Sequence, residues 1–225
     1  MMLILGAIMS EEGKSTQIVV SSLVSTPLNF PAPSEFVDAE HASKTRLAIQ
    51  ENGVYEQNGK TAVRVAALPQ ILSTDVVGSK KFFNNLPKKD KFKDGNDRYV
   101  RTPALKRELD DRIEKGFDAK KIEQLRESER CLAALRDNIK SRTIRGLTES
   151  ANRAGQKSLK KNKIERDNIT VCEGTGEPLE ANAQAHHKVR RADDPDLALD
   201  LDNIEILNEA AHAAHHADER KIEFE

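Results

Sequence analysis

Five of the six histidines of this chain lie in its last fifth, and their spacing restricts how that part can fold. His186 and His187 are adjacent, and His212 and His216 are four residues apart. Residues 183–189 fit a short strand, where neighbouring side chains point to opposite faces, so a site shared by His186 and His187 needs a twist or bend. Residues four apart on a helix share a face, so His212 and His216 form a natural two-ligand clamp for a divalent metal.

The residues between the two histidine pairs predict how the clamp is assembled. Ile204, Ile206 and Leu207 indicate a second short strand. Asn208 is a good N-cap for the alanine-rich helix expected over residues 209–217. The segment therefore predicts a strand, a loop, a second strand and a helix that together form a small metal cradle.

The order and spacing of these residues resemble the HNH, or His-Me finger, endonuclease family. The resemblance is closest to the colicin and pyocin DNases, in which a His-His pair precedes an Asn and an H-x-x-x-H helix. Here the pair is His186-His187, the Asn is Asn203 in a D-N dipeptide, and the helix carries His212 and His216. Two flanking motifs, one on each side of this pattern, also resemble intracellular HNH proteins of bacteria and phages: Cys172-x-x-Thr175-Gly176 and Ile222-Glu223-Phe224. The resemblance covers residues 172–225 and says nothing about residues 1–160.

This resemblance implies a role for each matched residue. His187 would be the general base that activates water, and Asn203 would hold its imidazole in orientation. His186, His212 and His216 would ligate one divalent metal ion, Mg²⁺, Mn²⁺, Ni²⁺ or Zn²⁺. The ion would polarise the scissile phosphate and stabilise the leaving oxygen. A further histidine, at position 215, matches no family position and is expected on a different helix face from His212, in solvent or as a weak phosphate contact.

The segment also departs from the family pattern. Many members hold a structural zinc with two CxxC pairs, whereas only Cys172 stands here. Colicin-type members have an Arg and a Glu just before the His pair, and this chain has no Arg there, which leaves Arg190 or Arg191 to neutralise the phosphate. The loop before the second strand is very acidic and would repel DNA unless its carboxylates face away or bind cations. Its acidic residues are Asp193, Asp194, Asp196, Asp200 and Asp202.

Charge is distributed unevenly along the chain. Residues 76–166 carry 26 Lys and Arg against 14 Asp and Glu, a net +12, whereas residues 167–225 carry 5 against 15, a net −10. A basic stretch is the usual footprint of a nucleic-acid partner, and equally of a solvated, salt-bridged helix surface. Around Phe92 and Tyr99, basic residues interleave with aromatic ones. Such a segment can bind nucleic acid, with the rings stacked on bases, or it can be an ordinary exposed loop. The candidate nucleic-acid-binding residues are Lys88, Lys89, Lys91, Arg98, Arg101, Lys160, Lys161, Arg190 and Arg191.

The expected fold class is α+β, with a mainly helical N-terminal and middle region followed by a C-terminal ββα-metal module. Ser34 is a plausible N-cap for a helix that ends before Gly53. Thr102-Pro103 predicts the start of another helix, and Gly116 separates it from a longer one over about 118–145. The predicted divisions are a flexible arm (1–33), a small helical subdomain with a basic loop (34–103), long basic helices with a linker (104–166) and the HNH nuclease-like domain (167–225).

The function expected from these features is a metal-dependent HNH endonuclease that hydrolyses phosphodiester bonds in DNA. Two alternatives remain open. The first is a non-catalytic DNA-binding or phage or mobile-element regulatory protein with a degenerate HNH module. The second is a defence-related interaction factor, with a protein partner or a homodimer formed through helix 118–145. Two distant cysteines and the lack of any stretch of membrane length predict a cytoplasmic protein without a membrane partner.

Overall fold

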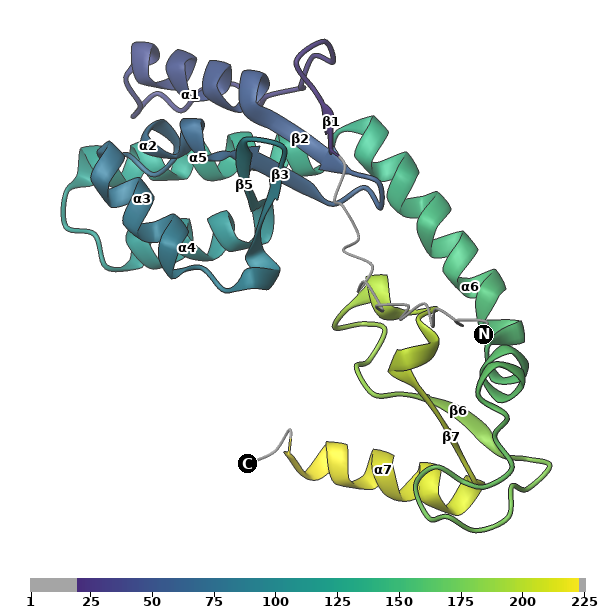
Figure 1. Cartoon of the computed structure of the whole chain (residues 1–225). Helices are drawn as coiled ribbons and strands as arrows, with labels where there is room; N and C mark the ends of the chain where they lie inside the picture. The colour runs from purple at the N-terminus through teal and green to yellow at the C-terminus, as the bar shows by residue number, and fades with distance from the viewer. Residues whose placement is uncertain (1–19, 223–225) are drawn as a thin grey trace, which may run out of the picture. The chain divides into compact units, whose positions relative to one another are not determined.

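The computed structural model of the chain describes residues 20–222. It divides into two compact units, Met1–Arg142 (unit 1) and Thr143–Glu225 (unit 2), each of which combines helix and strand (Figure 1). The α+β class is therefore confirmed. Of the predicted flexible arm, residues 1–19 lie outside the described part, and Val20–Ser22 is strand β1 of a sheet rather than an arm.

Unit 1 is built on a five-stranded antiparallel sheet with the order β1-β2-β3-β5-β4. The remaining strands are β2 (Gly53–Glu56), β3 (Thr61–Arg64), β4 (Lys91–Asp94) and β5 (Asp97–Arg101). The prediction of a helical subdomain over 34–103 is thus wrong for these segments, which form two β-hairpins. Gly59 and Gly95 have φ angles of 79° and 57°, values that a glycine adopts without strain in a tight turn.

The helices of unit 1 lie between and after these strands. They are α1 (Ala39–Asn52), η1 (Val65–Ala67), α2 (Leu68–Ile71), α3 (Val76–Asn85), η2 (Lys88–Asp90), α4 (Thr102–Glu114) and α5 (Ala119–Arg136). Asp38, not Ser34, caps α1, because its carboxylate accepts hydrogen bonds from the backbone N–H groups of Glu40 and His41. The predicted start of α4 at Thr102-Pro103 is confirmed.

The two faces of the sheet in unit 1 carry different cores. One face packs against α1, α4 and α5 through aliphatic side chains such as those of Val63 and Val100. On the other face the rings of Phe92 and Tyr99 are stacked, with centroids 5.2 Å apart. Arg101 covers Phe92 at 5.5 Å and Arg64 covers Tyr99 at 5.9 Å. Both rings are buried, so the prediction that these aromatics could stack on nucleic-acid bases is wrong.

Gly53 joins α1 directly to β2, and the junction leaves no room for a side chain. A Cβ atom there would lie 2.7 Å from the Ile49 carbonyl oxygen and 2.7 Å from a methyl group of Leu135. We expect Gly53→Ala to destabilise unit 1 by about 1–3 kcal/mol, because the backbone must shift to relieve this overlap. Both tyrosines, Tyr55 and Tyr99, lie in unit 1, so urea unfolding followed by tyrosine fluorescence measures the change there.

The matched control for this prediction is Gly146→Ala. A Cβ atom at Gly146 would meet nothing within 4 Å. Gly146 lies inside a helix of unit 2, where alanine is the better helix former, so this change should be neutral or should stabilise unit 2 by up to about 1 kcal/mol. Because both tyrosines lie in unit 1, tyrosine fluorescence should be unchanged by it, and far-UV circular dichroism in urea measures its own effect. Equal urea midpoints for wild type and Gly53→Ala would contradict the steric argument.

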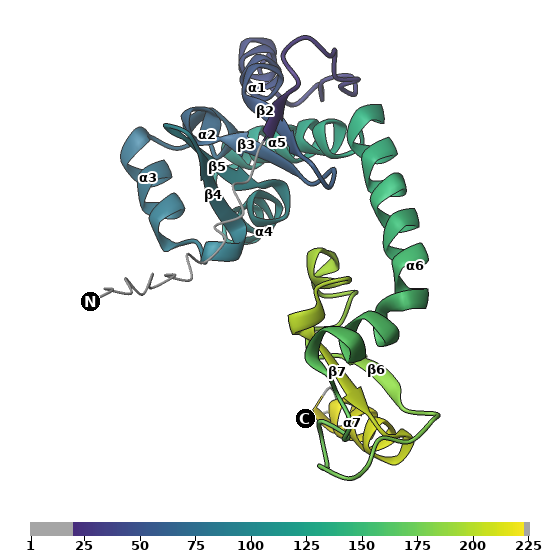
Figure 2. The same cartoon turned by 45° about the vertical axis from the view of Figure 1, so that its right-hand side comes forward.

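Unit 2 contains the last part of α6 (Ile139–Asp167) and a two-stranded antiparallel ribbon of β6 (Gln184–His187) and β7 (Ile204–Leu207), followed by α7 (Glu209–Ile222). Both strands and the start of α7 agree with the prediction. The segment 151–166, predicted as a linker at a domain boundary, is helical, and Leu159 within it joins the core of unit 2. The boundary between the units therefore falls inside α6, before the predicted position. Figure 2 shows the ribbon beside α6 and α7 from a second direction.

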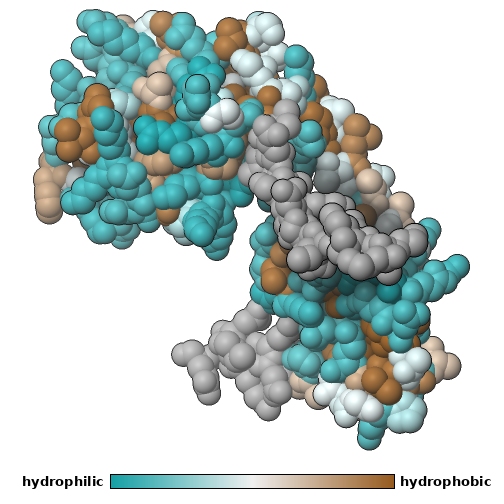
Figure 3. Space-filling view, viewed as in Figure 1, coloured by the Kyte–Doolittle hydropathy of each residue, from teal (hydrophilic) through white to brown (hydrophobic). Residues whose placement is uncertain are grey.

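Two surface properties complete the description. Hydrophilic residues cover most of the face of unit 1 presented in Figure 3, in keeping with the 32% of charged residues in the chain. Among the described residues, no helix has both the length and the apolar character needed to cross a membrane.

Candidate metal and histidine site

Three of the predicted ligands come together in unit 2. His186 on β6 and His212 and His216 on α7 have ring nitrogens that all lie within 4.8 Å of one another. His186 is buried, and the two helical histidines are half-buried. The ribbon and the helix thus bring three imidazoles to one point, as the spacing of the residues predicts.

The geometry of this trio fits a metal ion of the zinc type. Two imidazole nitrogens bound tetrahedrally at about 2.0–2.1 Å lie about 3.3 Å from each other. The Nε2 atoms of His212 and His216 are 3.3 Å apart. The ring nitrogens of all three histidines lie within 4.8 Å of one another, so any pair further apart than 3.3 Å must move closer to share an ion. Three protein ligands that leave a further position open are typical of catalytic rather than structural sites.

His187 lies on the other face of the β6–β7 ribbon. In an antiparallel pair, residues directly opposite each other share a face, and His187 pairs with Ile204 whereas His186 pairs with Glu205. Ile204 belongs to the core that includes Leu159 of α6. The predicted divergence of the two neighbouring histidines is therefore present.

The ring of His187 is held by a backbone carbonyl. Its Nε2 atom is 3.0 Å from the carbonyl oxygen of Ala198, which also accepts a 2.8 Å hydrogen bond from the side chain of Gln156 on α6. A carbonyl oxygen can only accept, so in the neutral ring Nε2 carries the hydrogen and Nδ1 carries the lone pair. The contact thus fixes which nitrogen of His187 can accept a proton.

Asn203 is buried and holds the loop between the two strands. Its Nδ2 donates to the carbonyls of Val189 and Leu197 at 3.0 and 3.1 Å, and its Oδ1 accepts from the Val189 N–H at 2.8 Å. All three hydrogen bonds run to backbone rather than to the ring of His187. Since Leu197 immediately precedes Ala198, Asn203 supports the ring of His187 through the loop that carries its acceptor.

The acidic loop is largely held by the protein's own donors. Asp193 pairs with Arg190 at 2.9 Å, and the Asp200 carboxylate accepts from the Asp202 N–H at 2.9 Å as a cap of η4 (Leu201–Asn203). In the same way Asp194 accepts from the Asp196 N–H at the start of η3 (Pro195–Leu197). These contacts neutralise or engage several of the loop carboxylates, which reduces the repulsion that the loop would exert on a phosphate.

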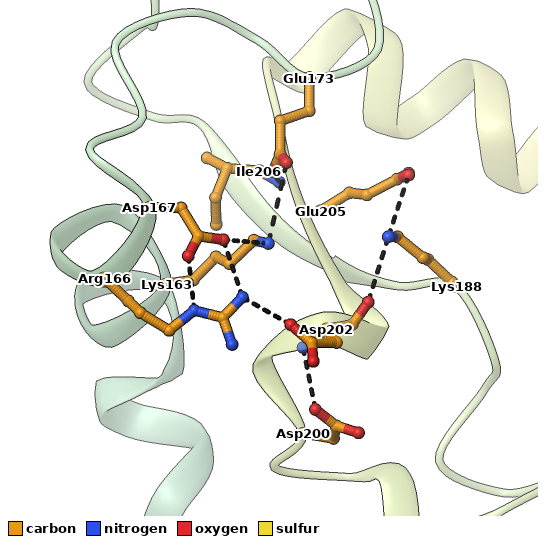
Figure 4. A network of polar contacts seen from close by, with 9 residues as sticks. All are labelled: Lys163, Arg166, Asp167, Glu173, Lys188, Asp200, Asp202, Glu205 and Ile206. Carbon is orange, nitrogen blue, oxygen red and sulfur yellow. Dashed lines mark hydrogen bonds and ion pairs between the residues drawn. The ribbon is translucent and has the colours of Figure 1, made fainter. Parts of the chain in front are cut away.

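A polar network joins the end of α6 to this loop and to β7 (Figure 4). Arg166 reaches Asp202 at 2.8 Å and also pairs with Asp167, and the buried Lys163 pairs with Asp167 at 2.6 Å. Hydrogen bonds from Arg166 and then Lys163 hold the pKa of Asp167 below its usual value. Glu173 accepts from the Ile206 N–H at 2.6 Å. Basic residues of the predicted linker therefore fasten α6 to the histidine module.

The two cysteines occupy different environments. Cys131 is buried in unit 1, and its pKa is raised to about 12, chiefly by burial. Burial also acts to raise the pKa of Cys172, but hydrogen bonds from the Thr175 hydroxyl and from the backbone N–H groups of Asn208, Thr175 and Gly174 outweigh it and lower the pKa. The Thr175 hydroxyl and a turn of backbone donors thus surround the sulfur of Cys172.

Asn208 differs from its predicted role. Its side chain does not cap α7 but binds the preceding segment, accepting from the Glu180 N–H at 3.0 Å and donating to the Pro178 carbonyl at 3.1 Å. His215 is exposed, as expected. Its ring centroid nevertheless lies 5.0 Å from that of His186, a closeness that reasoning from helix faces alone missed.

Several predicted nucleic-acid-binding residues serve the fold. Lys91 donates to the carbonyls of Phe83 and Asn84. Arg101 pairs with the buried Glu56 at 2.8 Å. Lys160 donates to the Ala181 carbonyl, and Arg98 lies over the Phe83 ring. Lys161 pairs with Glu165, and Arg190 pairs with Asp193. The remaining candidates are exposed: Lys88, Lys89 and Arg191. Five of the nine belong to unit 1 and four to unit 2.

Comparison of the chain with protein-family models, with curated proteins and with solved structures gives no match.

Proposed function

We propose that this protein is a metal-dependent endonuclease of the HNH, or His-Me finger, type and that unit 2 carries its active site. The observation that supports this most directly is the convergence of His186, His212 and His216, together with His187, the next residue along β6 after His186, whose proton-accepting nitrogen is fixed. The order strand, strand, helix in unit 2 is what a ββα-metal module requires. The proposed substrate is DNA.

In this proposal each histidine has one task. His186, His212 and His216 would hold the ion, which supplies charge for the scissile phosphate and the leaving oxygen. His187 accepts the proton of the attacking water at Nδ1, while the Ala198 carbonyl keeps the hydrogen on Nε2 and stabilises the charged ring that results. Asn203 keeps the loop around Ala198 in place.

The chemistry of the ligands predicts which metals support activity. Imidazole nitrogen suits Zn²⁺, Ni²⁺ and other transition ions, whereas Mg²⁺ prefers oxygen ligands and gives up its water reluctantly. We expect supercoiled plasmid to be nicked with Ni²⁺ or Zn²⁺ and less effectively with Mn²⁺ or Mg²⁺, which prefer oxygen ligands. EDTA should reduce nicking to background. The measurement is the initial rate of plasmid conversion at equal free metal concentrations.

A matched pair of variants distinguishes metal binding at the three-histidine site from adventitious metal binding elsewhere on the protein. His212→Ala removes a ligand and should lose both tight metal binding, measured by calorimetry, and nicking. His41→Ala removes a histidine of unit 1 and should change neither. If no metal supports cleavage while DNA still binds, the alternative of a binding protein with a degenerate module replaces the nuclease proposal.

A further inference from the structure

Unit 1 contains a hollow that the proposed active site does not use. It has a volume of about 320 Å³ and lies between the end of β3, α3 and the β4–β5 hairpin. A space of this size is at the lower end of the range for small-ligand sites. Its lining residues are Arg64, Val65, Ala66, Pro69, Val76, Ser79, Lys80, Asp97 and Arg98.

The hollow is positively charged. Three of its lining residues, Arg64, Lys80 and Arg98, are cationic, and only Asp97 is acidic. Asp97 is already paired with Arg64 at 3.0 Å. Among the described residues, no carboxylate lies within ion-pair distance of Lys80 or Arg98. An anion that enters the hollow could therefore pair with these two charges without breaking an existing ion pair.

Two further features suit a phosphodiester. Arginine side chains present a planar fork that matches phosphate oxygens, and two of the three cations here are arginines. Val65, Pro69 and the half-exposed Val76 add an apolar rim that a sugar or base can contact.

We propose that this hollow of unit 1 is a binding site for a phosphodiester group of a nucleic acid, held by Arg64, Lys80 and Arg98. The ligand's identity as nucleic acid rests on the proposed nuclease function, whereas the anion site rests on unit 1 alone. Of the three, only Arg98 was among the nucleic-acid-binding candidates singled out by sequence. Arg64 and Lys80 were not among them, and the candidates Lys91 and Arg101 are used within the protein.

Neighbouring lysines of α3 provide the test. Lys80 lines the hollow, whereas Lys81 is equally exposed and does not. In the full-length protein with EDTA, binding of a fluorescein-labelled 20-base-pair DNA is followed by anisotropy over a range of salt concentrations. Lys80→Ala should raise Kd about tenfold, and the slope of log K against log salt should fall by about 0.9. Lys81→Ala should change neither by more than about twofold.

Arg98→Lys is the second variant. It keeps the charge but loses the planar fork, so we expect Kd to rise several-fold with the salt slope unchanged. Circular dichroism confirms that each variant is folded. Equal weakening by Lys80→Ala and Lys81→Ala would overturn the site in favour of a diffuse basic surface. Tighter, Lys80-dependent binding of a poly-glutamate peptide than of DNA would overturn the choice of ligand.

These outcomes are independent of cleavage, since EDTA withholds the metal throughout. If the protein cuts plasmid but its DNA binding does not depend on Lys80, the nuclease proposal stands and the proposed phosphodiester site in the hollow is overturned. If DNA binding depends on Lys80 but no metal supports cleavage, the phosphodiester site stands and the nuclease proposal is overturned.

Discussion

A His187→Ala variant should nick plasmid about 10²–10⁴ times more slowly than the wild-type protein, the usual contribution of a positioned general base. It should bind the metal ion as tightly as before, because His187 lies on the opposite face of the β6–β7 ribbon from the three ligands. Nicking rates at saturating metal and calorimetric titration measure the two effects separately. This combination distinguishes a lost base from a lost metal.

His215→Ala is the matched control for that experiment. His215 is exposed and close to His186, yet it is not one of the three residues whose nitrogens converge. We expect its removal to change the rate by less than about tenfold, as for a contact outside the reaction itself. A His187→Ala protein that still cuts at the wild-type rate would remove His187 from the mechanism, whatever the behaviour of His215.

Asn203→Ala should reduce the stability of unit 2 by about 2–4 kcal/mol. The change removes three hydrogen bonds of a buried amide and leaves the N–H and the carbonyl of Val189 without this partner, whereas the Leu197 carbonyl keeps its bond from the Asp200 N–H. Far-UV circular dichroism in urea should show an earlier loss of part of the helix signal. Tyrosine fluorescence should be unchanged, because both tyrosines belong to unit 1.

Asn182→Ala provides the comparison. Its side chain is exposed and donates one hydrogen bond, to Glu209. Removing it should shift the stability by no more than about 0.5 kcal/mol. If Asn203→Ala proves as mild as Asn182→Ala, the loop does not depend on the buried amide and the link from Asn203 to the Ala198 carbonyl must be given up.

The sequence predicted the histidine module better than the rest of the chain. Histidine spacing and the isoleucines of residues 204–207 were enough to place β6, β7 and the start of α7. The sheet of unit 1 was missed because its strands have only three to five residues, too few for a clear alternation. The dipeptides Asn58-Gly59 and Gly95-Asn96 were signals that could have revealed both hairpins.

The surroundings of the site could not be predicted from residue types. The backbone carbonyl of Ala198 holds the ring of His187, and a backbone contact leaves no trace in the residue type. Gln156 supports that carbonyl from residues 151–166, which were predicted to be a linker. Lys163 and Arg166 were counted as basic surface, although their charges are taken up by Asp167 and Asp202. Such pairings depend on tertiary contacts between distant segments, which composition and spacing do not record.

The hydrogen bond from Gln156 to the Ala198 carbonyl bears on where a minimal catalytic fragment can begin. Cutting the chain at residue 167, where the sequence predicts the start of the C-terminal domain, would remove Gln156 together with Leu159 of the core. Such a fragment would keep His186, His187, His212 and His216, but the Ala198 carbonyl that holds the ring of His187 would lose its hydrogen bond from Gln156. We therefore expect a fragment that folds by itself to begin at about residue 143, where unit 2 starts, and not at the strand that carries the first histidines.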